Sequence, residues 1–197
     1  RTQLHGLKLS DRPLATMLSH RPTPKWETYP VNKEFLATRH VTPKMRSKVV
    51  RWMNSLCDQL ELLQVSAFHA VAILDHYLSI RDEEVKCLQL AAATCVYISS
   101  KLNDTRIFSA EVFTYSASGL FTDKQLHDKE VEVLQTIEFR MVHVNPCRVL
   151  KRIAQVDGLT PEQLSHAITI ARMGLESLTV QHTPLLDVLS VIIAHVE

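Results

Sequence analysis

Residues 88–101 read Leu-Gln-Leu-Ala-Ala-Ala-Thr-Cys-Val-Tyr-Ile-Ser-Ser-Lys. Wound as a helix, this stretch has almost no polar face, because apolar or small side chains point in nearly every direction. A helix that is apolar all round is normally surrounded by other helices. The stretch, extended back to Val85, therefore predicts the central helix of a bundle.

The sequence on both sides predicts the surrounding helices. Thr42-Pro43 begins one, since a capping residue followed by proline at the first helical position is a favoured helix start. Thr122 and Gln125 have the spacing of a capping box, in which each side chain satisfies the other's backbone donor. Apolar periodicity then predicts helices at about 43–60, 65–79, 109–117 and 122–138.

The second half of the chain repeats this order. Asn145-Pro146 begins a short helix, Thr160-Pro161 an amphipathic one, and Thr183-Pro184 an almost wholly apolar one. A loose repeat of this kind predicts two bundles of one design, the second cut short at Glu197. The expected organisation is an N-terminal extension with a short helix (1–41), a first bundle (42–141) and a partial second bundle (142–197).

Composition excludes several classes of protein. Hydrophobic residues make up 46% of the chain and glycine occurs only four times, which favours an all-α fold. The 22 basic and 21 acidic residues give a net charge of +1 without a basic stripe, so we expect no nucleic-acid partner. No uninterrupted apolar run of about 18 residues predicts a membrane span, and the segment after Arg1 has no signal-peptide pattern.

The chemistry-bearing residues do not assemble into a recognisable active site. The sequence contains no nucleophile–base motif and no glycine loop that would cradle phosphate, so we expect no enzyme, no catalytic residue and no cofactor. The cysteines are not spaced as metal ligands, which predicts a reduced, intracellular, metal-free protein. They are Cys57, Cys87, Cys95 and Cys147.

Three stretches together resemble the cyclin box. They are Met45–Met53, with Met-Arg and a Trp in the order of the family's opening helix; Leu74–Ser79, similar to its Asp-Arg-Phe-Leu-Ser; and Leu88–Lys101, similar to its central helix. The resemblance covers about residues 42–139 and weakens beyond. It implies a cyclin fold of two five-helix bundles, and a regulatory subunit that binds and activates a cyclin-dependent protein kinase in cell-cycle control, in the nucleus or cytoplasm.

Glu130 is the candidate site residue that also stands out without the resemblance. It interrupts the apolar stripe of its helix between Leu126 and Val133, and a buried carboxylate needs a partner. The alternative is a long side chain that reaches solvent at the edge of the stripe. Lys101 has an equally simple alternative, because the helix dipole favours a lysine in a last turn.

The resemblance implies that Lys101 and Glu130 act as a pair that binds backbone groups of the kinase. It also implies apolar kinase contacts from Leu102, Leu134 and Met141, which are equally plausible as core residues. A second implied site is a surface groove for short docking motifs of substrates or inhibitors. Its residues are Met45, Val49, Trp52, Leu88 and Gln89.

The sequence departs from the family at the groove and beside Asp75. Lys48 replaces an apolar groove residue and Ser55 an acidic one, which predicts a weakened or altered groove for basic docking peptides. His76 replaces the arginine that usually follows Asp75, so we expect an ion pair there to be weak or pH-dependent. His69 shares a helix face with His76, but two histidines alone do not predict a metal site.

The alternative function is a cyclin-fold adaptor or transcription-related module that binds protein or nucleic acid without activating a kinase. A nucleic-acid module would carry a basic stripe, and a peptide-binding pocket protein would lack the Lys101–Glu130 pair. The Ala-Ala-Thr-Cys-Val run at 92–96 is most similar to D-type cyclins, although divergent cell-cycle cyclins fit as well.

Overall fold

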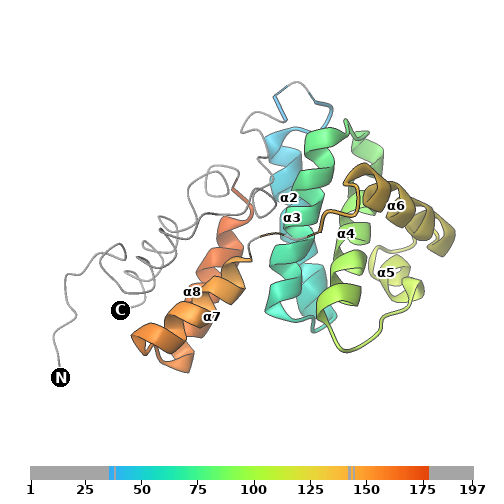
Figure 1. Ribbon diagram of the computed structural model, residues 1–197. Coiled ribbons are helices and arrows are strands. Elements are labelled where there is room, and N and C mark those ends of the chain that lie inside the picture. The colour runs from blue at the N-terminus through green and yellow to red at the C-terminus, as the bar shows by residue number, and fades with distance from the viewer. Residues whose placement is uncertain (1–35, 38, 142, 144, 178–197) are drawn as a thin grey trace.

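The computed structural model describes residues 36–37, 39–141, 143 and 145–177. Within these residues the chain forms helices joined by turns and contains no strand. The helices are α2 (Pro43–Gln59), α3 (Gln64–Ile80), the short 3-10 helix η2 (Val85–Cys87), α4 (Leu88–Asn103), α5 (Ala110–Ser116), α6 (Asp123–Thr136), α7 (Pro146–Asp157) and α8 (Pro161–Gly174). The all-α prediction is confirmed for this part of the chain (Figure 1).

The predicted helix starts are confirmed by their capping bonds. The Thr42 hydroxyl accepts a hydrogen bond from the backbone N–H of Met45, with Pro43 in the first turn. Thr122 and Gln125 form the predicted capping box of α6, and Thr160 with Gln163 forms one at α8. These caps satisfy backbone donors that a helix cannot satisfy itself, so they fix where each helix begins.

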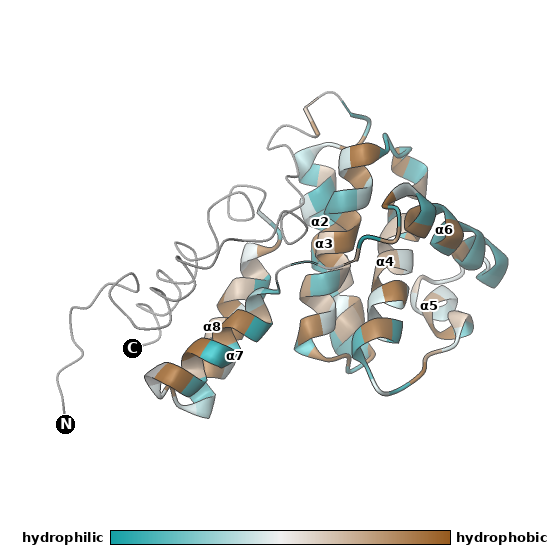
Figure 2. Cartoon of the chain, in the orientation of Figure 1, coloured by the Kyte–Doolittle hydropathy of each residue, from teal (hydrophilic) through white to brown (hydrophobic). Residues whose placement is uncertain are grey.

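Helix α4 is the centre of the first bundle, as predicted. Every residue from Ala91 to Ser100 is buried, and the helix packs against α2, α3, α5 and α6. Figure 2 shows mostly intermediate to hydrophobic residues along α4, whereas much of α6 is hydrophilic. The helix differs from the prediction at both ends, since residues 85–87 form a 3-10 turn before it and it continues beyond Lys101 to Asn103.

A buried ion pair ties the end of α8 to the first bundle. The Arg46 guanidinium on α2 binds Asp75 on α3 with two bonds, Nε–Oδ1 at 2.6 Å and Nη2–Oδ2 at 2.7 Å. Its remaining nitrogen, Nη1, donates to the backbone oxygen of Leu175 at 3.0 Å. One buried side chain therefore joins α2, α3 and the residue that follows α8.

Surface ion pairs reinforce the same junction. Arg172 of α8 binds Asp58 at 2.7 Å and the backbone oxygen of Asn54 at 3.0 Å. Glu176 accepts a 2.7 Å bond from Arg51. Helices α7 and α8 pack on each other and contact α3, so this helix pair is attached to the first bundle.

Several predictions fall outside the described residues. They are the short helix of the N-terminal extension and the apolar helix that begins at Thr183-Pro184. The domain boundaries and the truncated second bundle therefore stay predictions. None of the described helices combines the length and apolar composition needed to cross a membrane.

Candidate functional site

Lys101 and Glu130 meet on the surface of the first bundle. Lys101 lies in the last turn of α4 and Glu130 in the middle of α6. The Lys101 Nζ donates to both carboxylate oxygens of Glu130, at 2.7 Å and 2.9 Å. The two residues that the family resemblance pairs are therefore an ion pair within this chain, and their role toward a partner stays a prediction.

Two aromatic rings surround this pair. The Lys101 ammonium lies 3.8 Å from the centre of the Tyr97 ring, a cation–π contact. His127, one turn before Glu130 on α6, stacks edge-on against Tyr97 and places Nδ1 3.6 Å from Glu130 Oε2. The Glu130 side chain is only 15% exposed, whereas that of Lys101 is 41% exposed. The carboxylate is thus held in place rather than extended into solvent.

A second polar cluster fixes the rotation of α6. Lys129 is buried and binds Glu83 in the α3–α4 loop and Glu132 on α6, both at 2.9 Å. The Tyr77 hydroxyl of α3 lies 2.6 Å from Glu83 and 2.8 Å from Glu132. Consecutive helical residues point about 100° apart. Since Lys129 is anchored toward α3 and its loop, Glu130 is turned toward α4.

The ionisation of this cluster follows from burial and charge. Burial works to lower the pKa of Lys129, but its bonds to Glu132 and Glu83 outweigh that effect and raise the pKa above its ordinary value. Burial and the two carboxylates both raise the pKa of Tyr77. Lys129 is therefore charged and Tyr77 neutral at physiological pH. The sequence alone did not indicate this cluster, because Glu83 and Tyr77 lie 46 and 52 residues from Lys129 in the chain.

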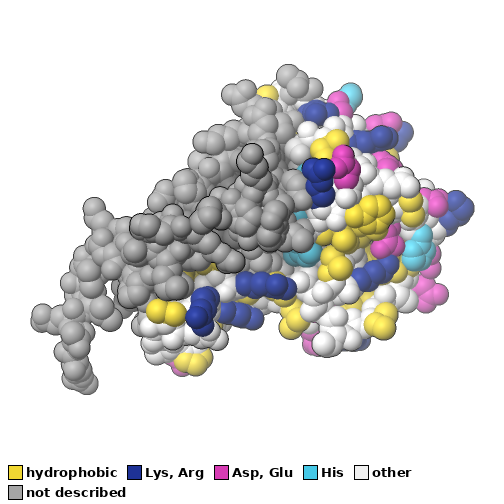
Figure 3. Space-filling view, viewed as in Figure 1, with side chains coloured by type: hydrophobic (Ala, Val, Ile, Leu, Met, Phe, Trp, Pro, Cys, Tyr) yellow, Lys and Arg dark blue, Asp and Glu magenta, His cyan; other side chains and the backbone are white. Residues whose placement is uncertain are grey.

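Four apolar side chains lie at the ends of α4 and α6 or just beyond α6. Leu102, next to Lys101, is 51% exposed, while Leu134 and Met141 are partly buried against the core. Phe139, just after α6, is 62% exposed with a left-handed backbone φ of 56°. Phe139 lies outside any helical pattern, so periodicity did not single it out. In Figure 3, hydrophobic side chains lie among charged ones over α4 and α6.

The residues predicted to form a docking groove come from α2 and α4, which contact each other. Val49 and Leu88 are buried, whereas Met45, Trp52 and Gln89 are partly exposed. Burial of the first two fits the simple alternative of a packed helix pair. Lys48 and Ser55 are exposed beside them. No measurement on this chain tests the groove, so it stays a prediction.

The expectation for His76 needs a correction. Asp75 takes Arg46 as its ion-pair partner, so the pair beside His76 has a guanidinium and is not weakened by the histidine. His76 instead packs edge-on against His143, which also contacts His69, each pair of rings at 5.7 Å. The described residues include no group of histidine, cysteine or carboxylate side chains arranged to hold a metal ion.

Burial governs the titration of the three histidines. It is the main cause that lowers the pKa of His69 and His76. Burial, followed by the two neighbouring rings, lowers the pKa of His143 to about 4. The carbonyl of Met141 binds both His69 Nε2, at 2.6 Å, and His143 Nδ1, at 3.1 Å. The cluster is therefore neutral at pH 7 and holds the segment between α6 and α7.

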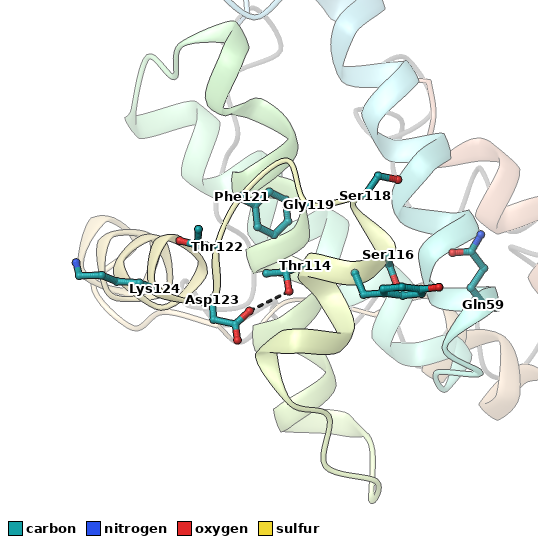
Figure 4. Close-up of a pocket in the computed structure, with 10 residues that line it drawn as sticks. Gln59, Thr114, Ser116, Ser118, Gly119, Phe121, Thr122, Asp123 and Lys124 are labelled. Atoms are coloured by element: carbon teal, nitrogen blue, oxygen red, sulfur yellow. Dashed lines mark hydrogen bonds between the residues drawn. The ribbon is translucent and has the colours of Figure 1, made fainter.

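An open pocket lies where α5 and α6 face the end of α2. Its lining includes Gln59, Thr114, Tyr115 and Asp123. Figure 4 shows Asp123 directed at Thr114, which donates to it at 2.9 Å, while Lys124 extends away. The buried cysteines are also poor nucleophiles, since burial raises the pKa of Cys57 to about 12. These features do not form a nucleophile–base arrangement.

Comparison with known proteins identifies the family. The model of the cyclin N-terminal domain matches residues 17–142. The chain belongs to the cyclin family. The similar curated proteins include the G2/mitotic-specific cyclin-B2 of Bos taurus, 26% identical over 77% of this chain and 38% of that protein. The G2/mitotic-specific cyclin cdc13 of Schizosaccharomyces pombe is 28% identical over 76% of this chain and 31% of that protein.

Solved structures support the same fold. A viral cyclin from herpesvirus saimiri superposes with a TM-score of 0.69 at 24% identity, over 86% of this chain and 72% of that one. A chain of the yeast RNA Pol II CTD kinase CTDK-1 complex gives 0.68 at 16% identity, over 84% and 60%. The predicted cyclin fold is confirmed. This cyclin spans less than two fifths of the two curated relatives, which carry mitotic names, and the likeness to D-type cyclins stays a prediction.

Proposed function

We propose that this cyclin is a non-enzymatic regulatory subunit that binds and activates a cyclin-dependent protein kinase in cell-cycle control. The observation that carries the proposal is the Lys101–Glu130 pair, an ammonium and a carboxylate held together on the surface by two different helices. The nucleus and the cytoplasm are the proposed locations, on grounds of family alone.

Activation in this proposal is a shift in the population of kinase conformations. A protein kinase needs a lysine–glutamate ion pair and an ordered activation loop before it transfers phosphate. A subunit that binds the active arrangement more tightly shifts the kinase toward it. To move the equilibrium from about 1:99 to 99:1, the differential affinity must supply about 5.5 kcal/mol. The catalytic groups then all belong to the kinase.

The geometry of the pair suits the binding of backbone groups. A lysine ammonium has three donors, and an ionised carboxylate has about four acceptor positions. Glu130 therefore keeps capacity to accept from a partner's N–H while Lys101 donates to a partner's carbonyl. The exposed side chains of Leu102 and Phe139 add apolar surface whose burial favours association. Leu134 and Met141 are partly buried against the core.

The test is capture of a kinase from cell extract with the tagged chain, followed by measurement of protein phosphorylation by the captured material. Lys101→Ala and Glu130→Ala are each expected to reduce the captured activity at least about tenfold, a loss of about 1.4 kcal/mol or more. The matched control is Lys124→Ala, which breaks an exposed 2.6 Å ion pair with Asp128 on the same helix and is expected to have no effect.

Two results would contradict the proposal. One is that the material captured by the unmodified chain has no protein kinase activity. The other is equal activity in Lys101→Ala, Glu130→Ala and the Lys124→Ala control. The second result would contradict the assignment of the kinase contact to the Lys101–Glu130 pair.

A further inference from the structure

The first half of α7 carries three exposed cations on one side of the helix. Arg148 lies three residues before Lys151 and four before Arg152, so its side chain is a neighbour of both. Within the described residues none of them forms an ion pair with a carboxylate. Arg148 and Arg152 bind only the neutral side chains of Asn103 and Gln155, both at 3.3 Å. Neighbouring like charges of this kind destabilise a helix.

The start of α7 differs from the starts of α6 and α8. The third residue of α6 is Gln125 and that of α8 is Gln163, and each closes a capping box. In α7 the same position is Arg148, behind the Asn145 cap. Helices α6 and α8 also have an acidic residue in the first turn, whereas α7 has none. A cation at this positive end of the helix dipole is unfavourable.

The cationic side of α7 reaches the end of α4 that carries Lys101. The bond from Arg148 to Asn103 places it beside the end of α4, two residues beyond Lys101. In Figure 3 Lys and Arg side chains gather over α7 on the same face of the molecule as α4 and α6. Arg148 and Lys101 therefore lie near the same end of α4.

We propose that Arg148, Lys151 and Arg152 form a docking surface for an acidic segment of a partner protein. Residues that lower local stability are expected where they serve binding. This cluster does so in two ways, because it places like charges next to one another and a cation at the positive end of the helix dipole. The arginine fork binds carboxylates with two parallel bonds, which suits Asp and Glu side chains. A nucleic acid fits less well, because the whole chain has a net charge of +1 and a pI near 7.9.

Fluorescence anisotropy with a labelled oligoglutamate peptide tests the surface directly. The variant Lys151→Glu/Arg152→Glu is expected to bind the peptide about tenfold more weakly than the unmodified chain at low ionic strength, with binding that weakens as salt rises. The matched control is Lys44→Glu/Lys48→Glu, which reverses two exposed cations on α2 and changes the net charge by the same amount. The control is expected to change affinity less than about twofold.

Equal weakening in the two double variants, or no binding by the unmodified chain, would overturn the docking surface. Tighter binding of duplex DNA than of the peptide, lost in the α7 variant, would overturn the choice of a protein partner. The kinase-capture experiment is separate, since Lys101→Ala and Glu130→Ala leave these cations in place.

A second variant separates binding from a structural role. Arg148→Gln gives α7 the residue that closes the capping box in α6 and α8. The melting temperature of the variant protein is therefore expected to rise, while its affinity for the peptide falls. If Arg148 is instead structural, the melting temperature falls. That result would remove Arg148 from the proposed surface.

Discussion

The Arg46 side chain connects three parts of this molecule. Its guanidinium is fully buried, neutralises Asp75 and also binds the carbonyl of Leu175 beyond α8. Buried charges are tolerated only when they are paired and hydrogen-bonded. The same residue therefore stabilises the α2–α3 contact and the attachment of α8.

Replacing Arg46 is expected to be severely destabilising. Arg46→Met leaves the Asp75 carboxylate buried without its ion-pair partner, and such a loss costs about 3–5 kcal/mol. Chemical denaturation followed by circular dichroism measures the free energy of unfolding. The double variant Arg46→Met/Asp75→Leu is expected to recover most of the loss, because no lone charge remains. A loss below about 1 kcal/mol in the single variant would contradict the role assigned to Arg46.

The histidine cluster predicts a fall in stability at mildly acidic pH. His143 has a pKa of about 4 in the folded chain and about 6.5 when unfolded. Between these values the unfolded state binds more protons, so stability is full above about pH 6.5 and decreases as the pH falls toward 4. Lowered pKa values at His69 and His76 add in the same direction. The charges of Arg140 and Arg148 nearby also disfavour protonation, whereas the backbone hydrogen bond with Arg140 and the charge of Glu138 favour it at His76.

The matched variant is His143→Asn, which removes the titrating group from the cluster. The difference in unfolding free energy between pH 7.5 and pH 4.5 is expected to be smaller in the variant by about 2 kcal/mol, since one unit of pKa shift corresponds to about 1.4 kcal/mol. The carboxylates titrate in both proteins, so their contributions to the pH dependence of stability cancel in the comparison. An identical pH dependence in the two proteins would show that His143 is not held neutral.

At the scale of helices, local signals predicted the architecture well. Thr42, Thr122 and Thr160 begin helices because each cap depends only on residues within one turn. The burial of α4 followed from its composition. Glu130 was recognised because a carboxylate interrupts an apolar stripe, and Arg46 offered a similar signal, since it lies on the same buried face of α2 as Val49 and Val50.

Features that depend on distant parts of the chain were not predictable in this way. The partner of Arg46 lies 29 residues away, and that of Lys129 lies 46 residues away. His143 joins His69 and His76 only after the chain has passed through α4, α5 and α6. Residue spacing along one helix does not predict contacts with distant helices. The sequence therefore indicated which residues are unusual but not what they contact.

The anchoring of α6 gives a test at the element scale. Lys129→Met leaves Glu83 buried without its ion-pair partner and is expected to lower the free energy of unfolding by about 2–4 kcal/mol. Lys124→Met on the same helix removes an exposed pair with Asp128 and is expected to cost at most about 0.5 kcal/mol. Urea denaturation of both variants provides the comparison. Equal losses would show that the Lys129 cluster does not hold α6.

At the scale of the whole molecule, the described chain joins a complete helical bundle around α4 to the α7–α8 pair. The junction depends on Arg46, Arg172 and Glu176, which connect α8 and its end to α2 and α3. The Lys101–Glu130 pair and the cations of α7 both lie next to the end of α4.

An exchange of the two charges tests the kinase-binding site most directly. In Lys101→Glu/Glu130→Lys the ion pair between α4 and α6 is retained with its direction reversed, so helicity and melting temperature are expected to stay close to those of the unmodified chain. A partner whose backbone groups fit one arrangement of donor and acceptor is not accommodated by the other. The proposed function predicts that the exchanged chain loses kinase capture and activation at least about tenfold. Full capture and activation by the exchanged chain, with its fold intact, would contradict it.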